Sequence, residues 1–153
     1  MPARTRQIVI RKVDVVPAPA EPIFASLEAF AEAAGDPTGL VYARLFAASP
    51  EMEALFVRDV DGAVRGQMLQ QVFETLIDHV GGRSYSANLI RCEVVNHENL
   101  GVPPAVFASF FHTVMETVRD TIGSEWTRET AAAWRTLLNE IDAVLSAHLA
   151  VTA

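Results

Sequence analysis

The sequence predicts an all-α fold of about six to eight helices, preceded by a short N-terminal extension. Apolar residues recur at intervals of three and four along most of the chain, which is the spacing of one face of a helix. Gly, Pro and Asp residues separate these segments at short intervals. Only residues 7–16, rich in Ile and Val, suggest a strand, and three prolines follow them. We therefore expect an extension over residues 1–21, with one short strand, and a helical domain over residues 22–153.

The first half of the domain contains three predicted helices. The first begins at Pro22 and ends at Gly35, a residue suited to a helix C-terminus. Asp36 and Pro37 start the second, because Asp caps free N–H groups and Pro fits the first turn. Residues 49–51 (Ser-Pro-Glu) start a short third helix that ends near Phe56, and residues 57–63 form a loop.

The second half begins with a long helix over residues 64–80, stopped by two glycines. Residues 83–102 have poor periodicity and are rich in Asn. Another long helix opens at Pro103-Pro104 and closes at Gly123. Thr127 caps the last helix, which continues almost to the C-terminus.

The composition excludes several classes of protein. A chain of 153 residues with 50% apolar and 20% charged residues suits one globular domain, and its apolar runs fall short of the ~20 residues of a membrane span. The net charge of −7 argues against nucleic acid as the main partner. The single cysteine, Cys92, excludes an intramolecular disulfide, and we expect it to be a small buried hydrophobe. With no apolar signal-peptide core at the N-terminus, these features predict a cytoplasmic protein without a membrane partner.

Three segments, in order, resemble the globin family, specifically its bacterial single-domain and flavohaemoglobin-like haemoglobins. Residues 40–56 (LVYARLFAASPEMEALF) resemble the family's second and third helices, and residues 96–103 (NHENLGVP) resemble its proximal histidine and the turn after it. Trp126-Thr127 and the Ala-Ala-Ala-Trp that ends at Trp134 resemble the start of its last helix. The resemblance implies a globin-like bundle around a haem pocket, haem b as cofactor, and a diatomic gas (O2, NO or CO) as ligand.

The resemblance also implies roles for particular residues. His97 is the implied iron ligand, whereas its polar neighbours Asn96 and Glu98 alone would suggest a solvated loop histidine. Tyr42 is implied to point into the distal pocket, where its hydroxyl would stabilise the bound gas. Phe56, Leu69, Val102 and Phe107 are the implied contacts of the porphyrin. The other three histidines, His79, His112 and His148, are expected at helix ends or on the surface.

Two positions depart from the family pattern. If Gly66 and Leu69 correspond to the family's close-approach glycine and pocket aliphatic residue, Arg65 is the distal residue; a shift by one residue makes it Val64. Arg65 has two open roles, as a donor to the gas or a haem propionate, or as a solvated surface arginine. Glu93 occupies a position usually held by leucine under the porphyrin. We therefore expect a short or displaced proximal helix, with Val94 or Val95 packing instead.

Three functions follow as hypotheses. The leading one is reversible binding of O2 or another diatomic gas. The second is a nitric-oxide dioxygenase, which requires a separate reductase because this chain has no Gly-rich dinucleotide-binding unit. The third is a globin-fold sensor or interaction module. The sequence leaves open whether the protein is a homodimer.

Overall fold

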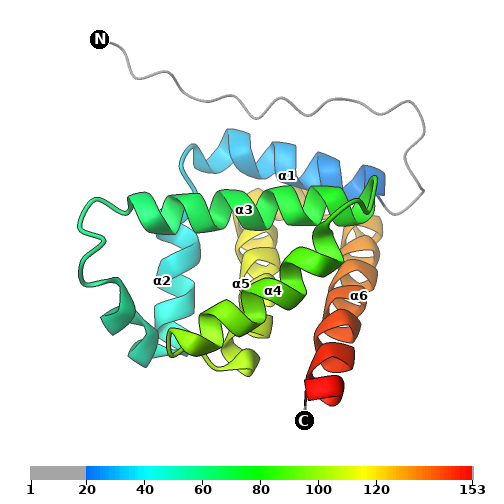
Figure 1. Cartoon of the computed structure of the whole chain (residues 1–153). Helices are drawn as coiled ribbons and strands as arrows, with labels where there is room; N and C mark the ends of the chain where they lie inside the picture. Colours follow the sequence, from blue (N-terminus) through cyan, green and yellow to red (C-terminus); the bar gives the residue numbers. More distant parts are fainter. Residues whose placement is uncertain (1–19, 153) are drawn as a thin grey trace.

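The computed structural model describes residues 20–152, and over this range it contains α-helices, two short 3₁₀ helices and no strand (Figure 1). The prediction of an all-α fold is confirmed. The predicted strand over residues 7–16 lies outside the described residues, as does nearly all of the 1–21 extension. The elements are α1 (Ala20–Ala34), α2 (Thr38–Ala48), η1 (Pro50–Phe56), α3 (Ala63–Val80), α4 (Ser86–Asn99), α5 (Pro104–Ile122), η2 (Gly123–Glu125) and α6 (Arg128–Thr152).

Most helix boundaries lie where the sequence predicts them, and each has a local cause. Gly35 follows α1 with φ 66°, a left-handed conformation that glycine adopts without strain. The Asp36 carboxylate accepts the Thr38 N–H at 3.1 Å and so caps α2. Thr127 Oγ1 accepts the Thr130 N–H at 3.1 Å and caps α6. One difference is that α1 begins at Ala20, two residues before Pro22.

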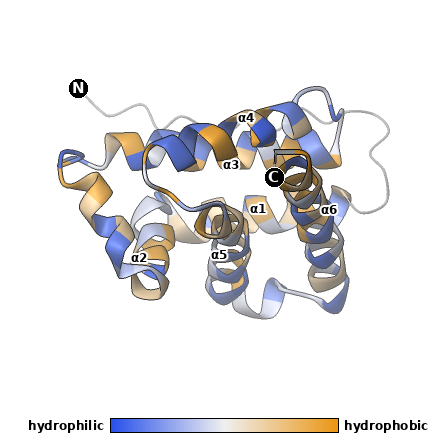
Figure 2. Ribbon diagram, turned by 60° about the horizontal axis from the view of Figure 1, so that its bottom comes forward, coloured by the Kyte–Doolittle hydropathy of each residue, from blue (hydrophilic) through white to orange (hydrophobic). Residues whose placement is uncertain are grey.

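The helices form two groups with the core between them. Figure 1 shows α3 and α4 on the near side and α5 behind them, and the rotated view of Figure 2 again separates α3 and α4 from α2, α5 and α6. Helix α1 packs on α5 and α6, α2 packs on α5, and α4 packs on both α5 and α6. In Figure 2 hydrophobic and hydrophilic residues alternate around each helix, as expected for helices with one buried face.

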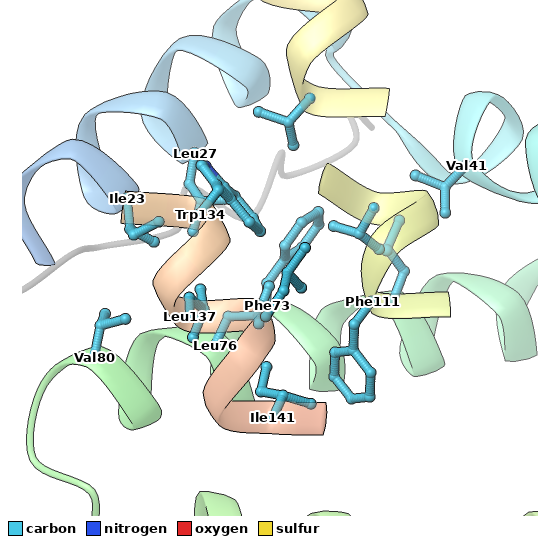
Figure 3. Packing of buried hydrophobic residues seen from close by; sticks show 14 of the residues in the cluster. Ile23, Leu27, Val41, Phe73, Leu76, Val80, Phe111, Trp134, Leu137 and Ile141 are labelled. Atoms are coloured by element: carbon cyan, nitrogen blue, oxygen red, sulfur yellow. The ribbon is translucent and has the colours of Figure 1, made fainter. Parts of the chain in front are cut away.

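The core is centred on Trp134 of α6, which is 1% exposed. Figure 3 shows its indole beside Leu27 of α1. The indole N–H donates to the Ser26 hydroxyl at 2.9 Å, and that hydroxyl donates to the Ile23 carbonyl at 2.8 Å. These bonds satisfy the buried polar atoms and join α1 to α6 across 108 residues of sequence.

The prediction that Cys92 is buried is wrong, whereas the prediction that His79 is a helix-end group is confirmed. Cys92 is exposed, because the residues of α4 that face inward are Ile90, Glu93 and Val94, and position 92 falls on the opposite side of the helix. His79 lies in the last turn of α3, as expected for a helix-end group, but it is 5% exposed and therefore not on the surface. Its ring is buried because Nε2 contacts the Glu140 carboxylate at 2.7 Å and Nδ1 contacts the Ser86 hydroxyl at 3.2 Å.

Candidate functional site

A largely apolar cavity lies between α3 and α4 on one side and α2, η1 and α5 on the other. The space among its side chains is about 750 Å³, including the part that opens to solvent. Its walls are formed by Tyr42, Leu45, Met52, Phe56, Met68, Gln71, Val72, Thr75, Leu89, Ile90, Glu93, His97, Val102, Val106, Phe107, Phe110 and Phe111. Of the residues that the resemblance implied, the structure brings Tyr42, Phe56, His97, Val102 and Phe107 together here.

His97 lies in the last turn of α4 with its ring in the cavity wall. Nδ1 is 2.8 Å from the carbonyl oxygen of Glu93, one turn earlier. Because a carbonyl can only accept, Nδ1 carries the hydrogen, and in the neutral ring the lone pair is then on Nε2. The ring also contacts Phe107, with 5.1 Å between the ring centres. The helix therefore holds this imidazole in the tautomer that binds a metal through Nε2.

The turn after His97 brings the chain back to the cavity. Gly101 has φ 96°, a conformation that other residues rarely adopt. The N–H groups of Leu100 and Val102 both donate to the His97 carbonyl, at 3.0 and 2.9 Å. This turn follows the end of α4, two residues after the histidine, and returns Val102 to the cavity wall.

Tyr42 forms part of the wall contributed by α2. Its ring is 2% exposed and contacts Phe56 and Phe110, each at 5.4 Å between ring centres, and Phe46 at 5.9 Å. Its hydroxyl has no hydrogen-bond partner, and it is the only such buried side-chain atom in residues 20–152. Burial raises the pKa of this hydroxyl, and the nearby Arg65 charge only partly opposes the effect. The hydroxyl is therefore a protonated, unused donor.

The α3 side of the cavity consists of Met68, Gln71, Val72 and Thr75. Leu69, the implied porphyrin contact, is 2% exposed and packs in the core rather than lining the cavity. The reason is helical phase: Leu69, Phe73, Leu76 and Val80 form the core stripe, and the cavity stripe lies one position before it. The periodicity of the sequence could have predicted this. Once the core stripe is placed, Met68 and Val72 fall on the adjoining face of α3, which lines the cavity.

The structure places neither proposed distal residue in the cavity lining. Val64 is 51% exposed. The Arg65 guanidinium forms an ion pair with the Asp59 carboxylate at 3.0 Å and donates to the Asp59 carbonyl at 2.9 Å. Its side chain lines a separate outer depression, and Tyr42 is the residue that lines both this depression and the cavity. The contacts with Asp59 therefore hold the positive charge of Arg65 in the outer depression, on the other side of Tyr42 from the cavity.

Glu93 lies within the cavity wall, and α4 is a regular helix of 14 residues, not a short one. Val94 is buried in the core and Val95 is exposed, so neither of them lines the cavity. Leu89 and Ile90, one turn before Glu93, supply the apolar surface on this side.

These features define a class of protein: a helical protein with an apolar cavity, an imidazole held through its Nδ1 in one wall and an unpartnered hydroxyl donor in another. Such a donor set fits a flat metal-bearing cofactor and a small polar ligand. A sequence model of the globin family matches residues 39–145, more than half of the chain. The chain belongs to the globin family, and this membership implies haem iron and a diatomic gas as ligand.

A comparison with curated proteins found no significant match in sequence. Among the helices of residues 20–152, none has the length and apolar character needed to cross a membrane.

Proposed function

We propose that this protein binds O2 or another diatomic gas reversibly at the iron of haem b, with His97 as the iron ligand and Tyr42 as the donor to the bound gas. The single observation that carries the proposal is the unpartnered Tyr42 hydroxyl, buried in a cavity that His97 also lines. Leaving a buried donor without a partner costs about 1–3 kcal/mol. A gas ligand with partial negative charge would remove that cost.

The chain's own residues divide the work of binding. The bound iron would supply the electrons that hold the gas. His97 Nε2 supplies a lone pair, and the Glu93 carbonyl keeps the ring from turning. Phe56, Val102 and Phe107 supply apolar contact surface and exclude water. In this proposal Met68 and Val72 form the wall near the gas, and Arg65 acts at the rim.

The hydroxyl of Tyr42 also supports a second candidate, nitric-oxide dioxygenation. A donor that slows the escape of O2 gives NO time to react with it, and a separate reductase would then restore the iron. Mixing the O2-loaded protein with NO in a stopped-flow instrument, with a reductase present, tests this. Nitrate formed over repeated cycles supports the enzyme, and a single turnover leaves gas binding as the function.

The finer features of the proposal come from the sequence. We infer a bacterial single-domain haemoglobin that works in the cytoplasm, with the haem domain at residues 22–153 after an extension at residues 1–21. A homodimer remains part of the proposal, and sedimentation of the purified protein tests it. The third hypothesis is a globin-fold sensor or interaction module; its haem-free form predicts a protein without a Soret band after incubation with haem.

Absorption spectra of the ferric, ferrous and CO-bound forms test the iron ligand. His97→Ala is expected to lose normal haem coordination, because no other histidine lines the cavity in the described part of the chain. His112→Ala is the matched control, since this half-exposed ring pairs with Asp142 at 3.0 Å away from the cavity. Unchanged spectra in His97→Ala would refute the assignment.

A further inference from the structure

Glu93 places two acceptors near the same nitrogen of His97. Its backbone carbonyl accepts the Nδ1–H at 2.8 Å, and one carboxylate oxygen, Oε2, is 3.5 Å from Nδ1. The two residues are one helical turn apart, so α4 itself fixes their spacing. The imidazole therefore has a full negative charge beside its N–H as well as a neutral acceptor.

The position of this carboxylate is held by a third residue. Asn96 donates from its side-chain amide to Oε1 of Glu93 at 3.3 Å, which leaves Oε2 on the side of His97. The side chains of Glu93 and His97 are 27% and 21% exposed, and both lie in the cavity wall. Partial exclusion of water strengthens the electrostatic interaction between the carboxylate and the ring.

Packing does not account for a carboxylate at this position. The backbone carbonyl of Glu93 already fixes the tautomer and the ring, and any residue at position 93 would provide it. A negative charge beside an apolar cavity loses hydration, whereas an aliphatic side chain there would gain contact surface. The property that Glu93 adds at this position is therefore the charge of its carboxylate.

Building on the proposed function, we propose that Glu93 is a positioning residue that makes His97 a stronger electron donor to the haem iron. Negative charge beside Nδ1–H polarises this N–H bond and increases the electron density that Nε2 offers to the iron. A stronger electron donor stabilises ferric iron more than ferrous iron. Glu93 thus lowers the reduction potential of the bound haem and strengthens the bond between iron and His97.

The experiment measures the reduction potential of the haem-loaded protein, together with the iron–histidine stretching frequency of the ferrous form by resonance Raman spectroscopy. Glu93→Gln keeps the shape and the backbone carbonyl but removes the charge. We expect a shift of roughly tenfold in the ferrous-to-ferric ratio at fixed potential, a rise of about 59 mV for one electron, and a lower stretching frequency.

Glu98→Gln is the matched control, because it removes the same charge from an exposed side chain next to His97 on α4. If Glu93→Gln and Glu98→Gln shift the potential equally, the proposal is overturned, because only net charge matters. Asn96→Ala keeps the charge of Glu93 and removes the hydrogen bond that holds its carboxylate. We therefore expect a smaller rise in the reduction potential than in Glu93→Gln. If Glu93→Gln fails to retain haem, Asn96→Ala decides alone, and an unchanged potential overturns the proposal.

The failure of the proposed function has a different signature. A wild-type protein without an iron–histidine band, or a His97→Ala variant that keeps the band, shows that His97 is not the ligand. A wild-type band that is lost in His97→Ala but unchanged in both Glu93→Gln and Asn96→Ala overturns only the role of Glu93.

Discussion

Among single residues, Tyr42 has the most unusual surroundings, because aromatic rings enclose it and its hydroxyl contacts no acceptor. Tyr42→Phe keeps the ring and removes only the donor. We expect O2 to dissociate about 5- to 150-fold faster, which corresponds to a lost hydrogen bond of about 1–3 kcal/mol. Flash photolysis with O2 and CO measures this rate.

The same substitution should leave the free energy of unfolding unchanged or slightly higher, because no hydrogen bond within the protein is lost. Urea denaturation of the haem-free protein measures it. Tyr85→Phe is the control, since the hydroxyl of Tyr85 lies outside the cavity and donates to the Glu74 carbonyl at 3.2 Å. If Tyr42→Phe and Tyr85→Phe release O2 at the same rate, Tyr42 does not hold the gas.

Residue chemistry alone could not find the site. His97 has polar neighbours in sequence, and the bond that fixes its tautomer comes from the carbonyl of Glu93, which any residue could supply. The resemblance to globins pointed to His97, Tyr42 and Phe56, all three of which line one cavity. The resemblance also predicted that Leu69 of α3 lines the cavity, because Gly66 suggested that alignment. The core stripe of α3 contains Leu69, and the residue that lines the cavity is Met68, one position earlier.

At the scale of elements, α3 and α4 share one feature. The N–H groups at the start of each helix donate to an aspartate that precedes it in the chain. Asp59 accepts the N–H groups of Val64 and Arg65 at the start of α3. Asp78 accepts the N–H groups of Ser84, Tyr85 and Ser86, at 3.1, 3.1 and 2.8 Å, before α4. Free N–H groups at a helix start favour such an acceptor.

Asp78→Ala should therefore destabilise the protein by about 1 kcal/mol at neutral pH, the usual cost of losing a helix cap. Burial alone would raise the pKa of Asp78, but the three N–H groups outweigh it and lower the pKa. A lowered pKa in the folded state gives stability that is present above the unfolded value, about 3.9, and is lost as the pH falls through the folded value.

Urea denaturation of wild type and Asp78→Ala at neutral and at acidic pH measures this difference. The gap between the two proteins should close in acid. A gap that stays constant with pH would mean that the carboxylate charge plays no part. Asp142→Ala is a suitable control, because its carboxylate pairs with a half-exposed histidine on α5 and caps no helix.

The elements differ in how well the sequence predicted them. Helices α3 and α5 each bury one face, so their apolar spacing is regular and both were predicted closely. Helix α4 packs on α5 and α6 and also lines the cavity with Glu93 and His97, so polar residues interrupt its apolar pattern. The polar residues that α4 contributes to the cavity wall therefore made it the hardest helix to predict.

Across the whole molecule, side-chain hydrogen bonds join helices that are far apart in sequence. The Trp134–Ser26 bond joins α6 to α1, and His79 joins α3 to both α4 and α6 through Ser86 and Glu140. Periodicity predicted the helices but not these pairings, because each depends on how two helices meet. No pattern near His79 predicts that its ring lies in the interior, since its partner Glu140 lies 61 residues away.

The link between His79 and Glu140 leads to a prediction for the stability of the whole fold. Glu140→Ala leaves a buried imidazole N–H without an acceptor, at a cost of about 2 kcal/mol. For a domain of this size, the Tm should fall by about 4–8 °C, as measured by circular dichroism. Arg83→Ala is the control, because this arginine also pairs with Glu140 at 2.9 Å but its side chain is 60% exposed, so the pair contributes little. If the two variants melt at the same temperature, the stabilising contact is the exposed ion pair, and the buried histidine does not tie α3 to α6.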